Sequence, residues 1–156
     1  MSITSVPDAH RAAVPYLIVS GAARAIEFYT ANFGATEVVR LADPSGKVMH
    51  AELRIADGSI MLADEFPDMG YRSPETLAGS AVSMLLYVDD VDTFFAKAVA
   101  GGGKVTMAVA DQFDGDHRGT LTDPFGHVWL IASKREVISP QELQARFKKM
   151  MAQGEA

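Results

Sequence analysis

The sequence contains no cysteine, and this absence excludes several kinds of site. A chain without cysteine forms no disulfide framework, thiolate zinc site or thiol nucleophile, and its composition fits a reducing compartment. We therefore predict a cytoplasmic protein. Long hydrophobic runs are also missing, since no stretch approaches the ~20 apolar residues of a membrane-spanning helix. The N-terminus has no basic segment followed by an apolar core, so the sequence predicts neither a membrane partner nor an export signal.

An excess of positive charge is missing too. Lys and Arg number 14 against 20 Asp and Glu, which gives a formal net charge of −6. This balance does not attract nucleic acid or an anionic membrane, and we expect neither as a partner. No serine lies in a strand–turn–helix elbow, and the glycines at 101–103 follow a predicted helix instead of preceding one. They predict the end of that helix, not a phosphate-binding loop.

The clearest local signal is the segment TLTDPFGHVWLIA at residues 120–132. Asp123, Pro124 and Gly126 are typical of a tight turn between two strands, so the segment predicts a hairpin. Alternate residues after the turn share a face, with Val128, Leu130 and Ala132 on one side and His127, Trp129 and Ile131 on the other. We expect His127 to be structural. The 156 residues, 48% of them hydrophobic, suffice for one compact domain.

The chain in order predicts one α/β unit that occurs twice. Residues 1–13 are predicted to be a loose lead-in with a solvated His10. A strand at 14–19 is followed by a helix that Ser20 begins and Gly34 ends, and then by strands at 36–41, 48–55 and 59–63. Residues 64–80 hold two prolines and two glycines, and we interpret them as a linker or mobile flap. A second strand at 82–88 and a second helix after Asp89 or Asp90 repeat the order.

Sliding the sequence by 69 residues superposes the two halves. Val19 falls on Val88 and Gly34 on Gly103, and with a one-residue indel Leu62 falls on Leu130. This pattern predicts two βαβββ modules at 14–64 and 82–133, joined by a linker at 65–81. At 139–153, Ser139, Pro140 and Glu142 form a capping box for an amphipathic helix. Its apolar side, with Leu143, Phe147 and Met150, packs either on its own sheet or on a partner subunit.

The paired modules and three segments resemble a known superfamily. The segments are AAVPYLIVSGAARAIEFYTANFGA, VMHAELRIADGSIMLAD and GTLTDPFGHVWLIA, and they resemble the vicinal oxygen chelate superfamily, which includes glyoxalases, bleomycin resistance proteins and extradiol dioxygenases. The element DQFDGDHRG at 111–119 and the Ser-Pro start of the last helix are similar to the PhnB-like branch. The resemblance implies an α+β fold, with a single domain at 14–138 whose two modules form a cup around a pocket. It also implies a homodimer.

The resemblance supplies a test for metal. Metal-using members place ligands at four positions, which correspond here to Val14, Ser83, Leu62 and Leu130. Divalent ions at such sites bind imidazole, carboxylate or amide oxygen, and none of these four side chains provides one. Shifting the alignment by one residue in either direction brings no metal-binding side chain to these positions. We therefore predict no metal at the usual place and no cofactor.

Polar side chains on alternate positions of the third strand are the candidate site. His50, Glu52 and Arg54 share one face, while Met49, Ala51, Leu53 and Ile55 are expected under the helices. We predict that His50 and Glu52 are the catalytic candidates, because a histidine titrates near neutral pH and exchanges protons readily. The predicted ligand-binding residues, which come from several strands, are Tyr16, Arg54, Ser83, Tyr87, Thr120 and Thr122.

The sequence leaves three functions open. The leading hypothesis is a metal-free protein that binds a small organic molecule in the cup. The alternative is a glyoxalase-like lyase or isomerase that uses His50 and Glu52 directly, or a relocated divalent metal together with His117. In the third, the protein is an interaction module without a ligand, whose cup is filled by its own side chains, and the polar face of His50, Glu52 and Arg54 is a solvated or mutually satisfied surface at a dimer seam. Asp111, Asp114, Asp116 and His117 are interpreted as a surface loop beside the pocket mouth.

Overall fold

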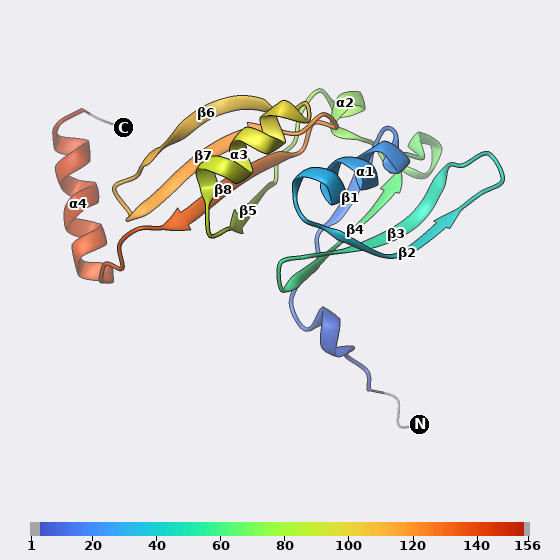
Figure 1. The fold of residues 1–156 in the computed structure, drawn as a ribbon, viewed down its shortest axis with the longest axis horizontal. Helices are drawn as coiled ribbons and strands as arrows, with labels where there is room; N and C mark the ends of the chain where they lie inside the picture. Colours follow the sequence, from blue (N-terminus) through green and yellow to red (C-terminus); the bar gives the residue numbers. More distant parts are fainter. Residues whose placement is uncertain (1–3, 155–156) are drawn as a thin grey trace. The chain divides into compact units, whose positions relative to one another are not determined.

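The computed structural model describes residues 4–154, and it has the predicted α+β architecture (Figure 1). The first part of the chain holds the 3₁₀ turn η1 (Asp8–His10) and the elements β1 (Tyr16–Val19), α1 (Ala22–Asn32), β2 (Thr36–Ala42), β3 (Val48–Ile55) and β4 (Gly58–Asp64). Next come η2 (Pro67–Met69) and α2 (Pro74–Leu77). The last part holds β5 (Ser83–Tyr87), α3 (Val91–Ala100), β6 (Lys104–Asp111), β7 (Asp116–Thr122), β8 (Val128–Lys134) and α4 (Pro140–Ala152).

The eight strands form two four-stranded mixed sheets with the same topology. Their orders are β1–β4–β3–β2 and β5–β8–β7–β6, and in each sheet the first pair is parallel and the others are antiparallel. This confirms the two βαβββ modules. The chain divides into two compact units, and the first unit holds the residues up to Ala81 together with Pro124–His127. The second holds Val82–Asp123 and the residues from Val128 onward. That the modules form a cup stays a prediction.

The strand register corrects how the two modules correspond. Tyr16 pairs with Met61 in the first sheet, and Leu85 pairs with Leu130 in the second. The shift of 69 residues that relates Tyr16 to Leu85 therefore also relates Met61 to Leu130. The predicted match of Leu62 with Leu130 was wrong, because the shift is 68 residues between β3 and β7, where Glu52 matches Thr120, but returns to 69 between β4 and β8. The turn between the last two strands therefore holds one more residue in the second module.

In the first unit, α1 covers one face of its sheet. Phe28, Tyr29 and Phe33 of this helix region are buried, and the ring of Phe125 lies 6.1 Å from that of Phe28. Phe125 belongs to the turn predicted from the DPFG sequence. Gly126 in that turn has φ +90°, and a Cβ there would lie 2.7 Å from Pro74, so the turn requires glycine.

The start of α1 differs from the prediction. Ser20 was expected to cap this helix, but the N-cap residue is Gly21, which has no side chain that could accept a hydrogen bond from the helix. The carboxylate of Asp64 does so instead, accepting hydrogen bonds from the backbone N–H of Gly21 (2.9 Å) and Ala22 (2.8 Å). Its other oxygen accepts from Val48 N–H at 2.8 Å. One residue at the end of β4 therefore fixes both the helix and β3.

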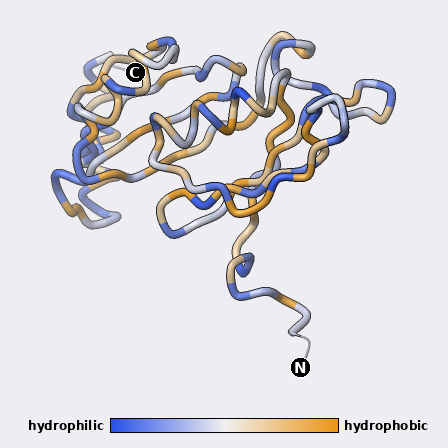
Figure 2. The backbone as a smooth tube through the Cα atoms, turned by 45° about the vertical axis from the view of Figure 1, so that its right-hand side comes forward, coloured by the Kyte–Doolittle hydropathy of each residue, from blue (hydrophilic) through white to orange (hydrophobic). Residues whose placement is uncertain are grey.

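The second unit is built around α3 and the buried face of its own sheet. The helix begins at the N-cap Asp90, whose side chain accepts a hydrogen bond from the N–H of Thr93. Of the two predicted N-cap residues, Asp89 and Asp90, the second is therefore the cap. Val91, Phe95 and Ala98 are buried against the sheet, opposite Leu121, Trp129 and Ile131. Figure 2 shows hydrophobic and hydrophilic stretches following one another along the backbone. Trp129 donates to the carboxylate of Asp123 at 2.9 Å, which ties the turn to the core.

The segment predicted as a linker or flap has structure of its own. It contains η2 and the short helix α2, and an isolated bridge pairs Phe66 with Tyr71. Glu65 holds the segment together by accepting from the N–H of Ser73 (2.8 Å) and the hydroxyl of Thr76 (2.8 Å). These hydrogen bonds hold the pKa of Glu65 below its ordinary value. The segment is therefore a folded cap on the first unit.

The last helix has the predicted N-cap, since Ser139 Oγ accepts from the N–H of Glu142 at 3.1 Å, but the carboxylate of Glu142 pairs with Arg146 and does not complete the predicted capping box. Arg146 pairs with Glu136 (2.7 Å) and Glu142 (2.8 Å), and the ring of Phe147 lies 5.9 Å from that of Phe113. No residue of α4 is buried. Within residues 4–154, no helix is long and apolar enough to span a membrane.

Candidate functional site

The candidate site lies on the face of the first sheet that α1 does not cover. Alternation along the strands places Leu17, Leu53 and Leu62 on the helix-covered face, where they are buried. The opposite face, called here the first open face, carries side chains of β1, β3 and β4, namely Tyr16, Ile18, His50, Glu52, Arg54, Ser59, Met61 and Ala63. The structure thus brings together the predicted site residues of the first module.

Tyr16 and His50 form a hydrogen-bonded pair on this face. The Tyr16 hydroxyl lies 2.8 Å from His50 Nδ1, and the two ring centroids are 5.6 Å apart. Burial, with a smaller effect from the nearby Tyr71, raises the pKa of Tyr16 above its ordinary value. The phenol therefore stays protonated near neutral pH. With the imidazole proton on Nε2, Tyr16 donates to Nδ1 and fixes the orientation of His50.

Glu52 is held by a partner that the sequence did not suggest. Its Oε1 lies 2.8 Å from His10 Nε2 and accepts from the Ser59 hydroxyl at 3.1 Å. The hydrogen bond from His10 is the largest cause that lowers the pKa of Glu52. The prediction that His10 is a solvated residue was wrong, because η1 places its ring against the sheet. Glu52 is therefore an ionised, largely buried carboxylate with its position fixed.

A pocket of about 300 Å³ opens beside this pair. Its walls are mainly aromatic and apolar and come from β1, β3, β4 and the segment after β4, namely Tyr16, Ile18, Met49, Ala63, Asp64, Phe66, Met69 and Tyr71. The amine of Lys47 lies 4.0 Å from the centre of the Phe66 ring. Such a pocket, with few polar groups, matches what a small organic ligand requires.

Met49 reaches the pocket because β3 is irregular. It was expected under the helix, but it is 48% exposed, whereas its neighbour Val48 is fully buried. The register with β2 shifts between Leu41 and Ala42, so Val48 takes the inward place and Met49 turns outward. The sequence also missed Phe66, Met69 and Tyr71, because they lie in the segment interpreted as a linker. The density of aromatic and methionine side chains there was the available signal.

The remaining predicted residues occupy separate places. Arg54 is exposed, and it pairs with Ser59 of β4 near the end of β3. Ser83, Tyr87, Thr120 and Thr122 belong to the second unit, on the face of its sheet that α3 does not cover. We call this the second open face. Tyr87 donates to Asp116 at 2.9 Å, and this hydrogen bond is the main cause that raises the pKa of Tyr87.

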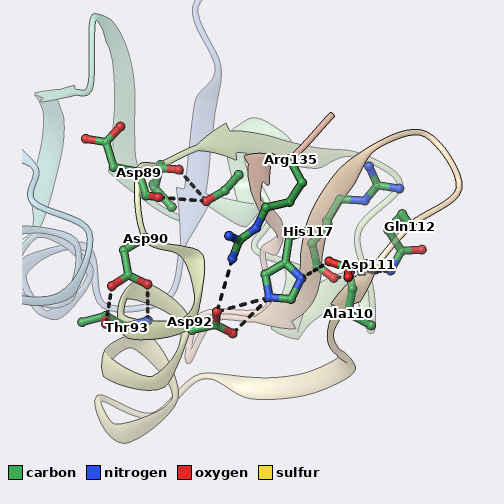
Figure 3. Close-up of polar contacts among 12 residues, drawn as sticks. Asp89, Asp90, Asp92, Thr93, Ala110, Asp111, Gln112, His117 and Arg135 are labelled. Atoms are coloured by element: carbon green, nitrogen blue, oxygen red, sulfur yellow. Dashed lines mark hydrogen bonds and ion pairs between the residues drawn. The ribbon is translucent and has the colours of Figure 1, made fainter. Parts of the chain in front are cut away.

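The loop residues predicted to lie together are divided between two faces. Asp116 is buried on the second open face, whereas His117 points to the helix side of β7. Figure 3 shows His117 between two carboxylates, with Nδ1 2.6 Å from Asp111 and Nε2 3.2 Å from Asp92. Arg135 lies 3.9 Å from Asp92. This arrangement joins α3 to β6 and β7, so its contacts are structural.

The four positions that hold metal in relatives can now be read from the register. They correspond to Val14, Ser83, Met61 and Leu130, since the register replaces Leu62 by Met61. None carries an imidazole, carboxylate or amide oxygen. Among residues 4–154, no group of three or more His, Asp or Glu side chains is arranged to hold a metal ion.

Comparison with known proteins places the fold. Two βαβββ modules with four-stranded mixed sheets define a glyoxalase-like protein. The model of the Glyoxalase/Bleomycin resistance protein/Dioxygenase superfamily matches residues 9–131, and the chain belongs to this superfamily. An uncharacterized protein of Mycobacterium bovis is 41% identical over 144 residues, which cover 90% of this chain and 93% of that protein.

Solved structures agree with this assignment. The Arabidopsis thaliana gene product At5g48480 has a TM-score of 0.62 at 30% identity, over 76% of this chain and 95% of that one. Protein PA1353 from Pseudomonas aeruginosa has a TM-score of 0.64 at 29% identity, over 79% and 97%. A PhnB protein from Bacillus cereus, at 22% identity and a TM-score of 0.62 over 77% and 97%, shows the same fold.

Proposed function

We propose that this protein binds a small, largely apolar organic molecule in the pocket on its first open face, without a metal at the family's usual position. The observation that carries the proposal is the pocket of about 300 Å³ whose walls are aromatic and methionine side chains. Burial of a ligand against such walls supplies most of the binding free energy, while the Tyr16–His50 pair supplies a directional polar contact.

A titration with the neutral dye Nile red tests this proposal. Met49→Glu places a charge in the pocket wall, and we expect it to weaken dye binding by roughly tenfold or more, because the charge must be desolvated. Leu77→Glu is the matched control, since Leu77 is 59% exposed in the same unit, lies outside β2 and does not line the pocket. Chelator should leave the dye affinity of the wild type unchanged. Equal loss in both variants would refute a specific pocket.

The Tyr16–His50 hydrogen bond favours a second candidate function, a glyoxalase-like lyase or isomerase. A phenol and an imidazole in contact beside a pocket can pass a proton to or from a bound substrate, and the fixed Glu52 carboxylate lies on the same face. The hemithioacetal of methylglyoxal and glutathione is a suitable test substrate. His50→Gln should abolish any turnover while Nile red affinity stays within about twofold. Absence of turnover in the wild type leaves binding as the function.

We also propose a homodimer, which the exposed side chains of β2 support. This edge strand exposes Val38, Val39 and Leu41, and an exposed apolar edge favours association. Sedimentation analysis should give twice the mass of 16.7 kDa for the wild type. The double variant Val39→Glu/Leu41→Glu should sediment as a monomer. A wild-type monomer at micromolar concentration would contradict the proposal.

A further inference from the structure

The second unit holds a pocket of its own, which the proposed function does not use. It has a volume of about 380 Å³ and lies between the second open face and the segment that leads into α4. Its apolar wall consists of Leu85 from β5 and of Val137, Ile138 and Leu143 from the C-terminal segment. The rest of the lining is charged or polar. Such a division suits a ligand with one apolar end and one charged end.

The charged part is organised around Asp116, which is 2% exposed. Lys134 forms an ion pair with its Oδ1, and its Oδ2 accepts from Tyr87 (2.9 Å) and from Arg118 Nη1 (2.8 Å). Burial raises the pKa of Asp116, but the hydrogen bonds and charges of Lys134, Tyr87 and Arg118 outweigh it, so the net shift is downward. Asp116 therefore remains ionised and holds both cations in place.

The carboxylate oxygens of this cluster have partners, but not all of its donors do. Asp114 accepts from Arg118 Nη1 at 2.9 Å and from the N–H of Asp116 at 3.1 Å, and Asp116 Oδ2 accepts from Tyr87. The fourth oxygen, Asp116 Oδ1, accepts no hydrogen bond from the residues that the structure describes and is held by the ion pair with Lys134. Among residues 4–154, Nε and Nη2 of Arg118 have no hydrogen-bond partner. A guanidinium presents five N–H donors, and Arg118 commits only those on Nη1.

We infer that this pocket binds a small monocarboxylate with a short apolar chain. The ligand carboxylate accepts from the Nε–Nη2 edge of Arg118 and from Lys134, in the two-point geometry that guanidinium and carboxylate groups favour. Its chain lies against Leu85 and Leu143. A dianion fits less well, because Asp114 and Asp116 already balance the charges of the two cations in the lining.

Hexanoate is a suitable probe, and amide chemical shifts in NMR spectra locate where it binds. We expect saturable shifts at Leu85, Val137 and Leu143. Acetate, which lacks the chain, and hexanol, which lacks the charge, should each bind at least about tenfold more weakly. The proposal fails if hexanol binds as well as hexanoate, or if hexanoate shifts only residues around Tyr16 and Met49.

Variants of the exposed pocket wall test the charge requirement without risk to folding. Val137 is 92% exposed, so neither Val137→Glu nor Val137→Lys should disturb the fold. We expect Val137→Glu to weaken hexanoate roughly threefold and Val137→Lys to strengthen it by a similar factor, with hexanol unaffected. Leu77→Glu is the matched control in the first unit, at 59% exposure. Equal affinities in both Val137 variants would overturn the inference.

Arg118→Gln gives the strongest test, and its thermal unfolding is measured in parallel. A folded Arg118→Gln protein that keeps full hexanoate affinity would refute the role of Arg118. This pocket and the pocket beside Tyr16 lie in different units, and hexanoate and Nile red are used to test them separately. If one probe fails to bind its pocket, the proposal for the other pocket is unaffected.

Discussion

The two open faces of this protein share a topology but differ in chemistry. In the first unit the face carries an aromatic and methionine pocket beside the Tyr16–His50 pair. In the second unit the corresponding strands carry a network of Asp116, Arg118 and Lys134. Register relates Glu52 to Thr120, since these residues pair with Met61 and Leu130, and His50 therefore corresponds to Arg118.

The covered faces, by contrast, remain alike. Ile26 and Phe95 are buried at corresponding positions of α1 and α3, and Leu62 and Ile131 at corresponding positions of β4 and β8. The helix-covered face must bury apolar area for the module to fold, so its pattern is constrained. The open face buries less apolar area, so its side chains are less constrained and differ between the two modules.

Removal of Asp116 should have the largest effect and should act on the second unit. Asp116→Ala leaves Arg118 and Lys134 as cations without their shared buried partner, and we expect a loss of about 3 kcal/mol in the free energy of unfolding. Urea unfolding followed by tryptophan fluorescence measures this loss, because the chain has one tryptophan, Trp129, in the second unit. A change below about 1 kcal/mol would mean that the network adds little to stability.

The second prediction concerns how each module fixes its helix. Asp64 accepts from three backbone N–H groups in the first unit, whereas α3 is capped locally by Asp90. Asp64→Ala should therefore cost about 2 kcal/mol of stability in the first unit. The corresponding residue, Ser133, donates to Val88 O at 2.7 Å, and Ser133→Ala should cost less. Hydrogen exchange of the α1 and α3 amides separates the two effects, and equal losses would contradict the proposed difference.

Local patterns predicted most of the fold. Alternation in β3 and β8, the DPFG turn and the Ser139 N-cap each depend on residues close in sequence, and the structure has them all except at the start of β3. The same alternation placed His50 and Glu52 on one face. It failed at Met49, because a register shift depends on the neighbouring strand and leaves no mark in the sequence of β3 itself.

The missed parts of the site depend on contacts between distant residues. His10 and Glu52 are 42 residues apart, and Asp64 caps a helix 43 residues earlier. Nothing in the neighbourhood of His10 indicates a partner, so a solvated histidine was the natural prediction. The division of Asp116 and His117 between two faces followed from alternation, once the start of β7 was fixed at Asp116. The bounds of that strand were the missing information.

Acid should weaken both units through their paired carboxylates. The pKa of Glu52 is lowered, chiefly by the hydrogen bond from His10, and the net shift of Asp116 is also downward. A lowered pKa in the folded state contributes stability that is complete above the ordinary carboxyl pKa of about 4 and is lost as the pH falls through the lowered value. Glu52→Gln should cost about 1 kcal/mol of unfolding free energy at pH 7 and should make the loss of stability on acidification less steep. If the free energy of unfolding of this variant fell with acid as steeply as that of the wild type, Glu52 would not contribute.

The smallest effects should come from the two tyrosines of the open faces. Tyr87→Phe removes a donor from the buried Asp116 and should cost about 1 kcal/mol, whereas Tyr16→Phe breaks a hydrogen bond at an exposed site and should cost about 0.5 kcal/mol. Tyr16→Phe should instead change the environment of His50, which ¹⁵N spectra of the imidazole report directly. Tyr87→Phe leaves those signals unchanged, since its contacts belong to the second unit. If Tyr16→Phe destabilised the protein more than Tyr87→Phe, the first open face, and not the second, would contain the structural network.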